Sequence, residues 1–163
     1  MIYKLIKTIG YTKFFIKKPS QKKIIIFDRG GAHLIIDFFQ NKHDIFILDT
    51  RKESLNLFVI LKLIFEFKKI NFKNYIKTYI KLVNPKAIIT FVDNNVFFYE
   101  LKNLFRNKIF ISIQNGLRLK AGGDLLEELE NKKENKNKYA LDKYFIFNDE
   151  IGKELGQYIK TDF

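Results

Sequence analysis

Short, almost continuously apolar runs alternate with longer amphipathic segments along the chain from residue 23 onward. Such runs are typical of strands buried on both faces, and the segments between them have the apolar spacing of helices that cover a sheet. The pattern predicts five strands, at residues 23–28, 45–49, 87–92, 109–113 and 144–148. Because parallel strands need crossover connections, we expect an α/β fold: a Rossmann-like, doubly wound, mainly parallel five-stranded sheet with helices on both faces.

The predicted helices lie in the connections between these strands and after the last one. The first begins at Gly30-Gly31 and turns four apolar residues inward, namely Leu34, Ile35, Phe38 and Phe39. Two helices fill the long second connection: Leu55–Lys69, with Ser54 as a candidate N-cap, and Phe72–Val83, which Asn84-Pro85 ends. Further helices are expected at residues 93–105 and 149–158.

A polar cluster directly follows each of the first four predicted strands. The clusters are Asp28-Arg29-Gly30-Gly31, Asp49-Thr50-Arg51, Asp93-Asn94-Asn95 and Gln114-Asn115-Gly116-Leu117-Arg118. In open α/β sheets the ligand crevice lies outside the carboxyl ends of the strands, so we expect these clusters to meet at one rim. One such cluster by itself is commonly a helix cap, which is the ordinary interpretation of Asp93 or Asn94. Four clusters at one edge favour a binding site.

The segment at Asn115-Gly116 also permits a β-hairpin, since Asn-Gly between alternating apolar residues is a strong hairpin signal. Leu117, Leu119 and Ala121 would then form the returning strand. The nearly continuous apolar run at 109–113 instead favours a strand buried on both faces, followed by a loop.

The residue types at the rim indicate what it can bind. Backbone N–H groups at Gly30-Gly31 can approach an anion, but no dinucleotide or P-loop glycine motif is present, so we predict no cofactor. Three arginines can each clamp a phosphate or carboxylate: Arg29, Arg51 and Arg118. Four amides suit sugar hydroxyls: Asn94, Asn95, Gln114 and Asn115.

Candidate acids and metal ligands are few. Asp28, Asp49 and Asp93 can act as general bases or bind magnesium, but no residue can be assigned a catalytic role. A phosphatase with an aspartate nucleophile at position 28 would need Asp at position 30, which is Gly. The chain has no cysteine and only two histidines, which are not spaced like a zinc pair, so we predict no metal site.

Length and composition fit one globular domain, with 163 residues, 47% hydrophobic and 29% charged. The longest apolar stretch, 55–67, contains Asn56, Lys62 and Glu66, and is too short and too polar to span a membrane. The N-terminus lacks a continuous apolar region and a cleavage site for secretion. We therefore expect a cytoplasmic protein.

The net charge of +12 is concentrated at the N-terminus, where the first 23 residues contain seven lysines and no acidic residue. Residues 1–22 form a basic amphipathic segment before the domain at 23–163. Its composition is that of a helix at an anionic membrane surface, and equally that of a packed leader helix with a solvated lysine face. Residues 122–138 are polar; 124–130 can form acidic amphipathic turns, and the stretch as a whole is expected to be a surface loop.

Five segments carry a resemblance to a known family: "IIIFDRGG", "FILDTRKESLNLFVIL", "NYIKTYIKLVNPKAIITFVDNNVFFYEL", "IFISIQNGLR" and "DKYFIFNDEIGKEL". In this order they resemble bacterial surface-carbohydrate (surface polysaccharide) biosynthesis proteins, over roughly residues 20–158. The resemblance implies the N-terminal, acceptor-side domain of a GT-B-type glycosyltransferase-like protein. It also implies which residues line the interdomain cleft: Asp49, Arg51, Asn56, Asp93, Asn94, Gln114, Asn115, Gly116 and Arg118.

The partner implied by this resemblance is a carbohydrate or lipid-linked saccharide acceptor. The composition of residues 1–23 separately allows contact with anionic lipid at the inner face of the cytoplasmic membrane. A nucleotide sugar would bind only through a second domain, which this sequence does not contain, so we expect no transfer by the chain alone. One alternative is a stand-alone Rossmann-like domain that binds a nucleotide or another anion. A basic nucleic-acid-binding module is less favoured, because the aromatic residues have core spacing, and no nucleic acid is expected as a partner.

Overall fold

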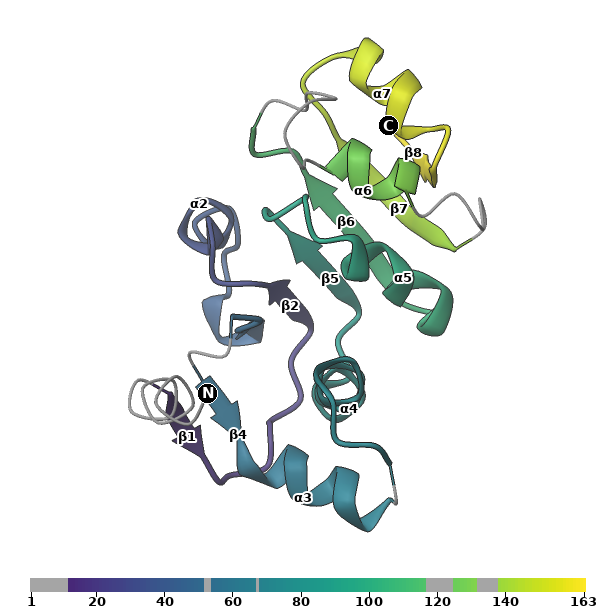
Figure 1. Ribbon diagram of the computed structural model, residues 1–163. Helices are drawn as coiled ribbons and strands as arrows, with labels where there is room; N and C mark the ends of the chain where they lie inside the picture. Colours follow the sequence, from purple (N-terminus) through teal and green to yellow (C-terminus); the bar gives the residue numbers. More distant parts are fainter. Residues whose placement is uncertain (1–11, 52–53, 67, 117–124, 132–137) are drawn as a thin grey trace.

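The computed structural model describes residues 12–51, 54–66, 68–116, 125–131 and 138–163. Its centre is a six-stranded sheet in the order β3-β2-β5-β6-β7-β8, in which every neighbouring pair is parallel (Figure 1). The strands are β2 (Ile24–Phe27), β3 (Ile45–Leu48), β5 (Ala87–Thr90), β6 (Ile109–Ile113), β7 (Tyr139–Phe145) and β8 (Ile159–Asp162). The α/β class and the mainly parallel sheet predicted from the sequence are confirmed.

The predicted number of five strands is wrong, because β8 adds a sixth strand at the edge beside β7. Its sequence, IKTD, lacks the apolar run by which the other strands were found, and only Ile159 is buried. β7 also begins at Tyr139 instead of Tyr144. Its register shifts between Ala140 and Lys143, and this irregularity breaks the alternation that a sequence prediction needs.

A separate two-stranded parallel sheet joins β1 (Lys13–Phe15) to β4 (Ser54–Asn56). Part of the basic N-terminal segment is therefore a strand and not a helix, while residues 1–11 lie outside the described part of the chain. Ser54 belongs to β4 and does not cap the next helix. The Asn56 side chain caps it instead, by accepting a hydrogen bond from Val59 N at 3.3 Å.

Five helices contribute to the core on one face of the large sheet, and the first of them does so by packing against the second beside the small sheet (Figure 1). They are α3 (Leu57–Phe65), α4 (Phe72–Val83), α5 (Val96–Leu104), α6 (Leu125–Asn131) and α7 (Asp149–Leu155). α4 has its predicted bounds: the Asn71 side chain caps its start, and Asn84 ends it in the left-handed conformation, with φ of 50°. None of the helices in the described ranges is long and apolar enough to cross a membrane.

α6 corrects the expectation of a surface loop at residues 122–138. Leu125, Leu126 and Leu129 are buried in the main core, while Glu128 is exposed. The expected acidic turns therefore form a packed amphipathic helix, because three leucines on one side bury enough apolar surface to hold it on the sheet.

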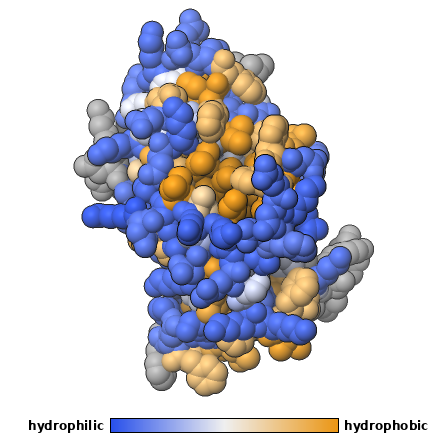
Figure 2. Space-filling model, turned by 180° about the vertical axis from the view of Figure 1, so that it is seen from behind, coloured by the Kyte–Doolittle hydropathy of each residue, from blue (hydrophilic) through white to orange (hydrophobic). Residues whose placement is uncertain are grey.

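The other face of the sheet is covered, among the described helices, by α2 (Ala32–Ile36), while a 3-10 turn (Lys42–Asp44) precedes β3. Leu34 and Phe38, which were expected to face inward, are 48% and 86% exposed. Leu34 lies on the side of α2 away from the buried Ala32 and Ile35, and Phe38 lies beyond the end of the helix at Ile36. On β6 and β7 the side chains of Ile111, Ile113 and Phe145 stay partly exposed. Figure 2 shows the molecule from behind, with hydrophobic side chains gathered in its upper half.

Candidate functional site

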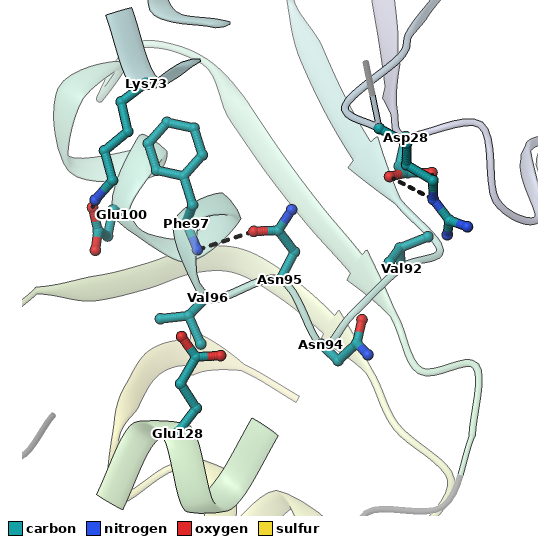
Figure 3. A pocket seen from close by; sticks show the side chains of 10 residues that line it. Asp28, Lys73, Val92, Asn94, Asn95, Val96, Phe97, Glu100 and Glu128 are labelled. Atoms are coloured by element: carbon teal, nitrogen blue, oxygen red, sulfur yellow. Dashed lines mark hydrogen bonds and ion pairs between the residues drawn. The ribbon is translucent and has the colours of Figure 1, made fainter. Parts of the chain in front are cut away.

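A cavity of about 380 Å³ opens at the carboxyl ends of β2, β3 and β5 (Figure 3). The loops after these strands contribute Asp28, Arg51, Asn94 and Asn95, and helices α4, α5 and α6 contribute the opposite wall. From β2 the chain continues to β3 at one edge of the sheet. From β5, the other neighbour of β2, it continues through β6 and β7 toward the opposite edge. Ligand crevices of open α/β sheets lie at such a point. The structure thus brings together residues from three of the four predicted clusters.

Asp28 organises one side of this cavity. The residue is 3% exposed, and its φ of 79° lies in the left-handed region, which is uncommon outside glycine. Its Oδ1 accepts a hydrogen bond from Gly30 N at 2.8 Å, and its Oδ2 accepts one from the Thr50 hydroxyl. Arg51 Nε lies 3.2 Å from Oδ1. A buried carboxylate with three partners therefore fixes a guanidinium group whose side chain is 58% exposed.

The two predicted glycines after β2 serve this arrangement. A Cβ at Gly30 would lie 2.9 Å from both Nη2 of Arg51 and a methyl carbon of Val92, so a larger residue there would displace these side chains. Gly31 has φ of 68°, and a Cβ there would lie 2.2 Å from the Phe91 ring. The N–H of Gly30 is already used by Asp28. Glycine at these two positions thus shapes the loop and allows α2 to start.

The opposite wall is built around Glu100 on α5. Lys73 Nζ donates to Glu100 Oε2 at 3.0 Å and lies 5.2 Å from the ring centroid of Phe97. Lys138 Nζ lies 3.3 Å from Oε1 of the same carboxylate. Burial opposes ionisation of Glu100, but the hydrogen bonds and charges of the two lysines together hold its pKa below the ordinary value. This wall therefore presents an ionised carboxylate held between two ammonium groups.

Amides and a further carboxylate complete the cavity. The Asn95 side chain caps α5, because its Oδ1 accepts a hydrogen bond from Phe97 N at 3.2 Å, which leaves Nδ2 as a donor. Asn94 is exposed and its side chain makes no hydrogen bond within the part of the chain that the structure describes. Glu128 points from α6 toward Val96 (Figure 3). Donors and acceptors of this mixed kind match the hydroxyl groups of a sugar.

Three other predicted residues, Arg29, Asp49 and Asn56, line a separate cavity of about 260 Å³ between β1, β3, β4 and α4. Asn56 has a structural role there, since its Nδ2 donates to Lys17 O at 2.9 Å while its Oδ1 caps α3. Burial, aided by Tyr79 and then by the charge of Asp49, raises the pKa of Tyr75 to about 12, although the hydrogen bond from Asn56 N to the Tyr75 hydroxyl opposes the shift.

Four further predicted residues lie at the ends of β5 and β6 and line neither cavity: Asp93, Gln114, Asn115 and Gly116. Asp93 is fully buried, and its two oxygens accept hydrogen bonds from Tyr144 Oη at 2.9 Å and Asn115 N at 3.4 Å. Burial raises the pKa of Tyr144, which keeps its hydroxyl protonated as a donor. The Gln114 side chain donates to Gly116 O at 2.7 Å and accepts from a backbone N–H of the segment after β7 at 2.9 Å.

Residues 114–116 follow β6 as a loop, as favoured over the hairpin. The alternative returning strand and Arg118 fall within 117–124, outside the described residues.

Sequence reasoning missed the part of the main cavity that comes from helices. Lys73 lies in the first turn of α4 and Glu100 in the second turn of α5. Both helices begin at the carboxyl edge of the sheet, and this position was the available signal. The sequence around Glu128 gave no sign that this residue lines the cavity, because its position there depends on how α6 packs against α5.

Comparisons of the chain with protein-family models, with curated proteins and with solved structures found no match. Among the described residues, no three histidine or acidic side chains are grouped closely enough to hold a metal ion.

Proposed function

We propose that the chain is the acceptor-side domain of a glycosyltransferase-like protein in bacterial surface-carbohydrate biosynthesis, and that its 380 Å³ cavity binds the acceptor saccharide. The observation that carries the proposal is that Arg51, Asn94 and Asn95 line one cavity at the carboxyl edge of a parallel sheet. The resemblance in the sequence supplies the family, and the chemistry of the cavity supplies the class of ligand.

A Rossmann-like, doubly wound topology is part of this proposal. Numbered along the chain, the six strands of the large sheet have the order 2-1-3-4-5-6. This order contains 2-1-3-4-5, the order of one common doubly wound class, in which ligands bind where the winding reverses. The cavity lies at the corresponding point, between the loops after β2 and β5.

The side chains of the cavity fit a saccharide better than a purely anionic ligand. Asn94, Asn95 and the carboxylates offer donors and acceptors for several hydroxyl groups at once. The guanidinium group of Arg51 is held in place by its ion pair with Asp28. It suits a phosphate group on a lipid-linked saccharide, because a guanidinium can bind two phosphate oxygens at once. The negative charges of Glu100 and Glu128 lower the affinity of the cavity for a ligand with several negative charges.

Transfer itself is assigned to a second domain or partner chain that would bind the nucleotide sugar, and no described residue is given a catalytic role. Cytoplasmic location and contact of residues 1–23 with anionic lipid belong to the same proposal. Flotation of the chain with vesicles that contain anionic lipid tests the membrane contact separately from saccharide binding.

Titration of the isotope-labelled chain with mono- and disaccharides, followed by NMR, tests the proposal. We expect saturable shifts of the amides at Asn94 and Phe97, with a Kd of about 1 mM, since a lone acceptor site gains few contacts. Asn94→Ala should weaken binding several-fold without unfolding the chain, because this exposed side chain makes no contact that the fold needs.

Asn107→Ala is the matched control. Asn107 is an exposed asparagine in the turn before β6, at the amino ends of the strands and therefore away from the cavity. Absence of saturable shifts with every saccharide, or equal effects of the two substitutions, would contradict saccharide binding in this cavity.

The fixed guanidinium of Arg51 favours one alternative, a stand-alone domain that binds a nucleotide or another anion in the same cavity. In that case inorganic phosphate or a nucleotide would shift the amides of Arg51 and Asn94 in a saturable way while saccharides would not.

A further inference from the structure

The 260 Å³ cavity between β1, β3, β4 and α4 has no role in the proposed function, yet it has the features of a second binding site. Four aromatic side chains form much of its wall: Phe15, Phe46, Tyr75 and Tyr79. The rings of Phe46 and Tyr79 stack with centroids 5.2 Å apart, and Tyr75 meets Tyr79 edge to face at 5.7 Å. Such walls suit the flat ring system of a small ligand.

Asp49 lines this cavity with one carboxylate oxygen unsatisfied. The residue is 7% exposed, and its Oδ1 accepts a hydrogen bond from Arg51 N at 2.8 Å. Its Oδ2 is buried and has no hydrogen-bond partner among the described residues. A buried charged acceptor without a donor is destabilising, and a ligand N–H group would remove that cost.

Two cationic side chains line the same cavity and are also unengaged. Arg29 and Lys17 are exposed, and neither side chain forms an ion pair or hydrogen bond within the described ranges. The backbone of Lys17 is fixed, because its carbonyl accepts a hydrogen bond from Asn56 Nδ2 at 2.9 Å. An arginine and a lysine on one rim can together bind a phosphate group.

We propose that this cavity binds a nucleoside monophosphate. The base lies against the aromatic wall, a ring or exocyclic N–H of the base donates to Asp49 Oδ2, and the phosphate binds Arg29 and Lys17. Guanine suits the site, because either its ring N–H or its exocyclic amino group can donate a hydrogen bond to Asp49 Oδ2. The cavity volume, slightly below the range of about 300–1,000 Å³ for drug-sized ligands, fits a ligand of this size with its phosphate at the rim.

This inference stands apart from the proposed function. The two cavities share no lining residue. Asp49 lines one and Arg51 the other, and the backbone N–H of Arg51 donates to Asp49 Oδ1 at 2.8 Å. Saccharide binding in the first cavity can therefore fail while nucleotide binding in the second holds, and the reverse.

Calorimetric titration of the full chain with GMP, guanosine and inorganic phosphate tests the phosphate contact. We expect GMP to bind at least about tenfold more tightly than guanosine, as a charge-assisted phosphate contact would give. Arg29→Ala should remove that advantage and leave guanosine binding unchanged. Arg106→Ala, an exposed arginine after α5, is the matched control and should change neither affinity.

Asp49→Asn tests the base contact. It keeps the shape of the side chain but places an amide donor where the base N–H groups point, so GMP affinity should fall at least about tenfold. Three results would overturn the proposal: no saturable GMP binding, inorganic phosphate binding as tightly as GMP, or loss of GMP binding in Asn94→Ala, which would move the nucleotide to the other cavity.

Discussion

The two faces of the six-stranded sheet differ in how completely the described residues cover them. On one face, helices α3 to α7 bury Ile25, Phe98 and Phe110 fully in a single large core. On the other face α2 covers a small core, and Ile111 and Phe145 stay partly exposed beside it. Parallel sheets are usually buried on both faces. The contrast shows that the described residues complete one core of the sheet and only begin the other.

Strand order explains why the helices are distributed so unevenly. The crossover from β2 to β3 runs toward one edge of the sheet, while the crossovers that follow all run toward the other edge. Right-handed crossovers that run in opposite directions place their helices on opposite faces. α2 therefore lies by itself among the described helices on its face, and a helix of five residues is too short to cover six strands.

Phe98→Ala should show the largest effect and so tests the contrast most directly. The Phe98 ring centroid lies 5.1 Å from that of Phe27 and 5.5 Å from that of Phe110, and the side chain is fully buried. Its removal should lower the free energy of unfolding by about 3–5 kcal/mol, because a cavity remains. Urea unfolding measures this loss.

Phe145→Ala, on the face of the sheet that α2 covers only in part, is the matched substitution. The residue is 52% exposed, so the loss should be about 1 kcal/mol, since only part of its surface leaves water on folding. Equal losses for the two phenylalanines would mean that the faces are equally buried in solution.

The sequence predicted well those elements whose apolar pattern fixes their place. The isoleucine-rich runs of β2, β3, β5 and β6 were found because a strand buried on both faces needs continuous apolar residues. β8 and β4 were missed, because their short, partly polar sequences form strands only through pairing with a neighbour. α6 was predicted only as acidic amphipathic turns within a surface loop, because three leucines are too few to indicate burial from the sequence alone.

The candidate site likewise contains residues that were predicted from the sequence and residues that were not. Arg51 and Asn94 meet because both follow parallel strands, a consequence of topology that the pattern of strands already implies. Asp93, next to Asn94, was predicted to face the same rim but is buried under Tyr144. Neighbouring residues of a loop point in different directions, and the sequence does not tell which one faces the ligand. Lys73 depends on helix packing and was therefore missed.

Two tyrosines of β7 test polar packing in the large core, and the expected effect is intermediate. Tyr144 donates to the buried Asp93 carboxylate at 2.9 Å, so Tyr144→Phe should cost about 1–3 kcal/mol of the free energy of unfolding. Tyr139 is 2% exposed, and its hydroxyl has no hydrogen-bond partner among the described residues. Tyr139→Phe should be neutral or slightly stabilising in the same urea assay. A loss at Tyr139 as large as at Tyr144 would refute the assigned hydrogen bond.

Glu100 lies on α5, lines the main cavity and forms ion pairs with Lys73 and Lys138. Its substitution should have the smallest effect on the free energy of unfolding. Its pKa is lower in the folded chain than its ordinary value of 4.5, so its ion pairs with Lys73 and Lys138 stabilise the fold above that pH. This contribution is lost as the pH falls through the folded-state pKa. Between pH 6 and pH 3 the unaltered chain should therefore lose more stability than Glu100→Gln, by less than about 1 kcal/mol for such partly solvated pairs.

Urea unfolding at a series of pH values measures this difference, and Glu150→Gln, at an exposed position in α7, should follow the curve of the unaltered chain. If the Glu100→Gln curve also runs parallel to that of the unaltered chain, the two lysines gain nothing from the carboxylate. The wall of the cavity would then be held by the apolar packing of α5 on the covered face, and Lys73 would be free to bind a ligand anion in place of Glu100.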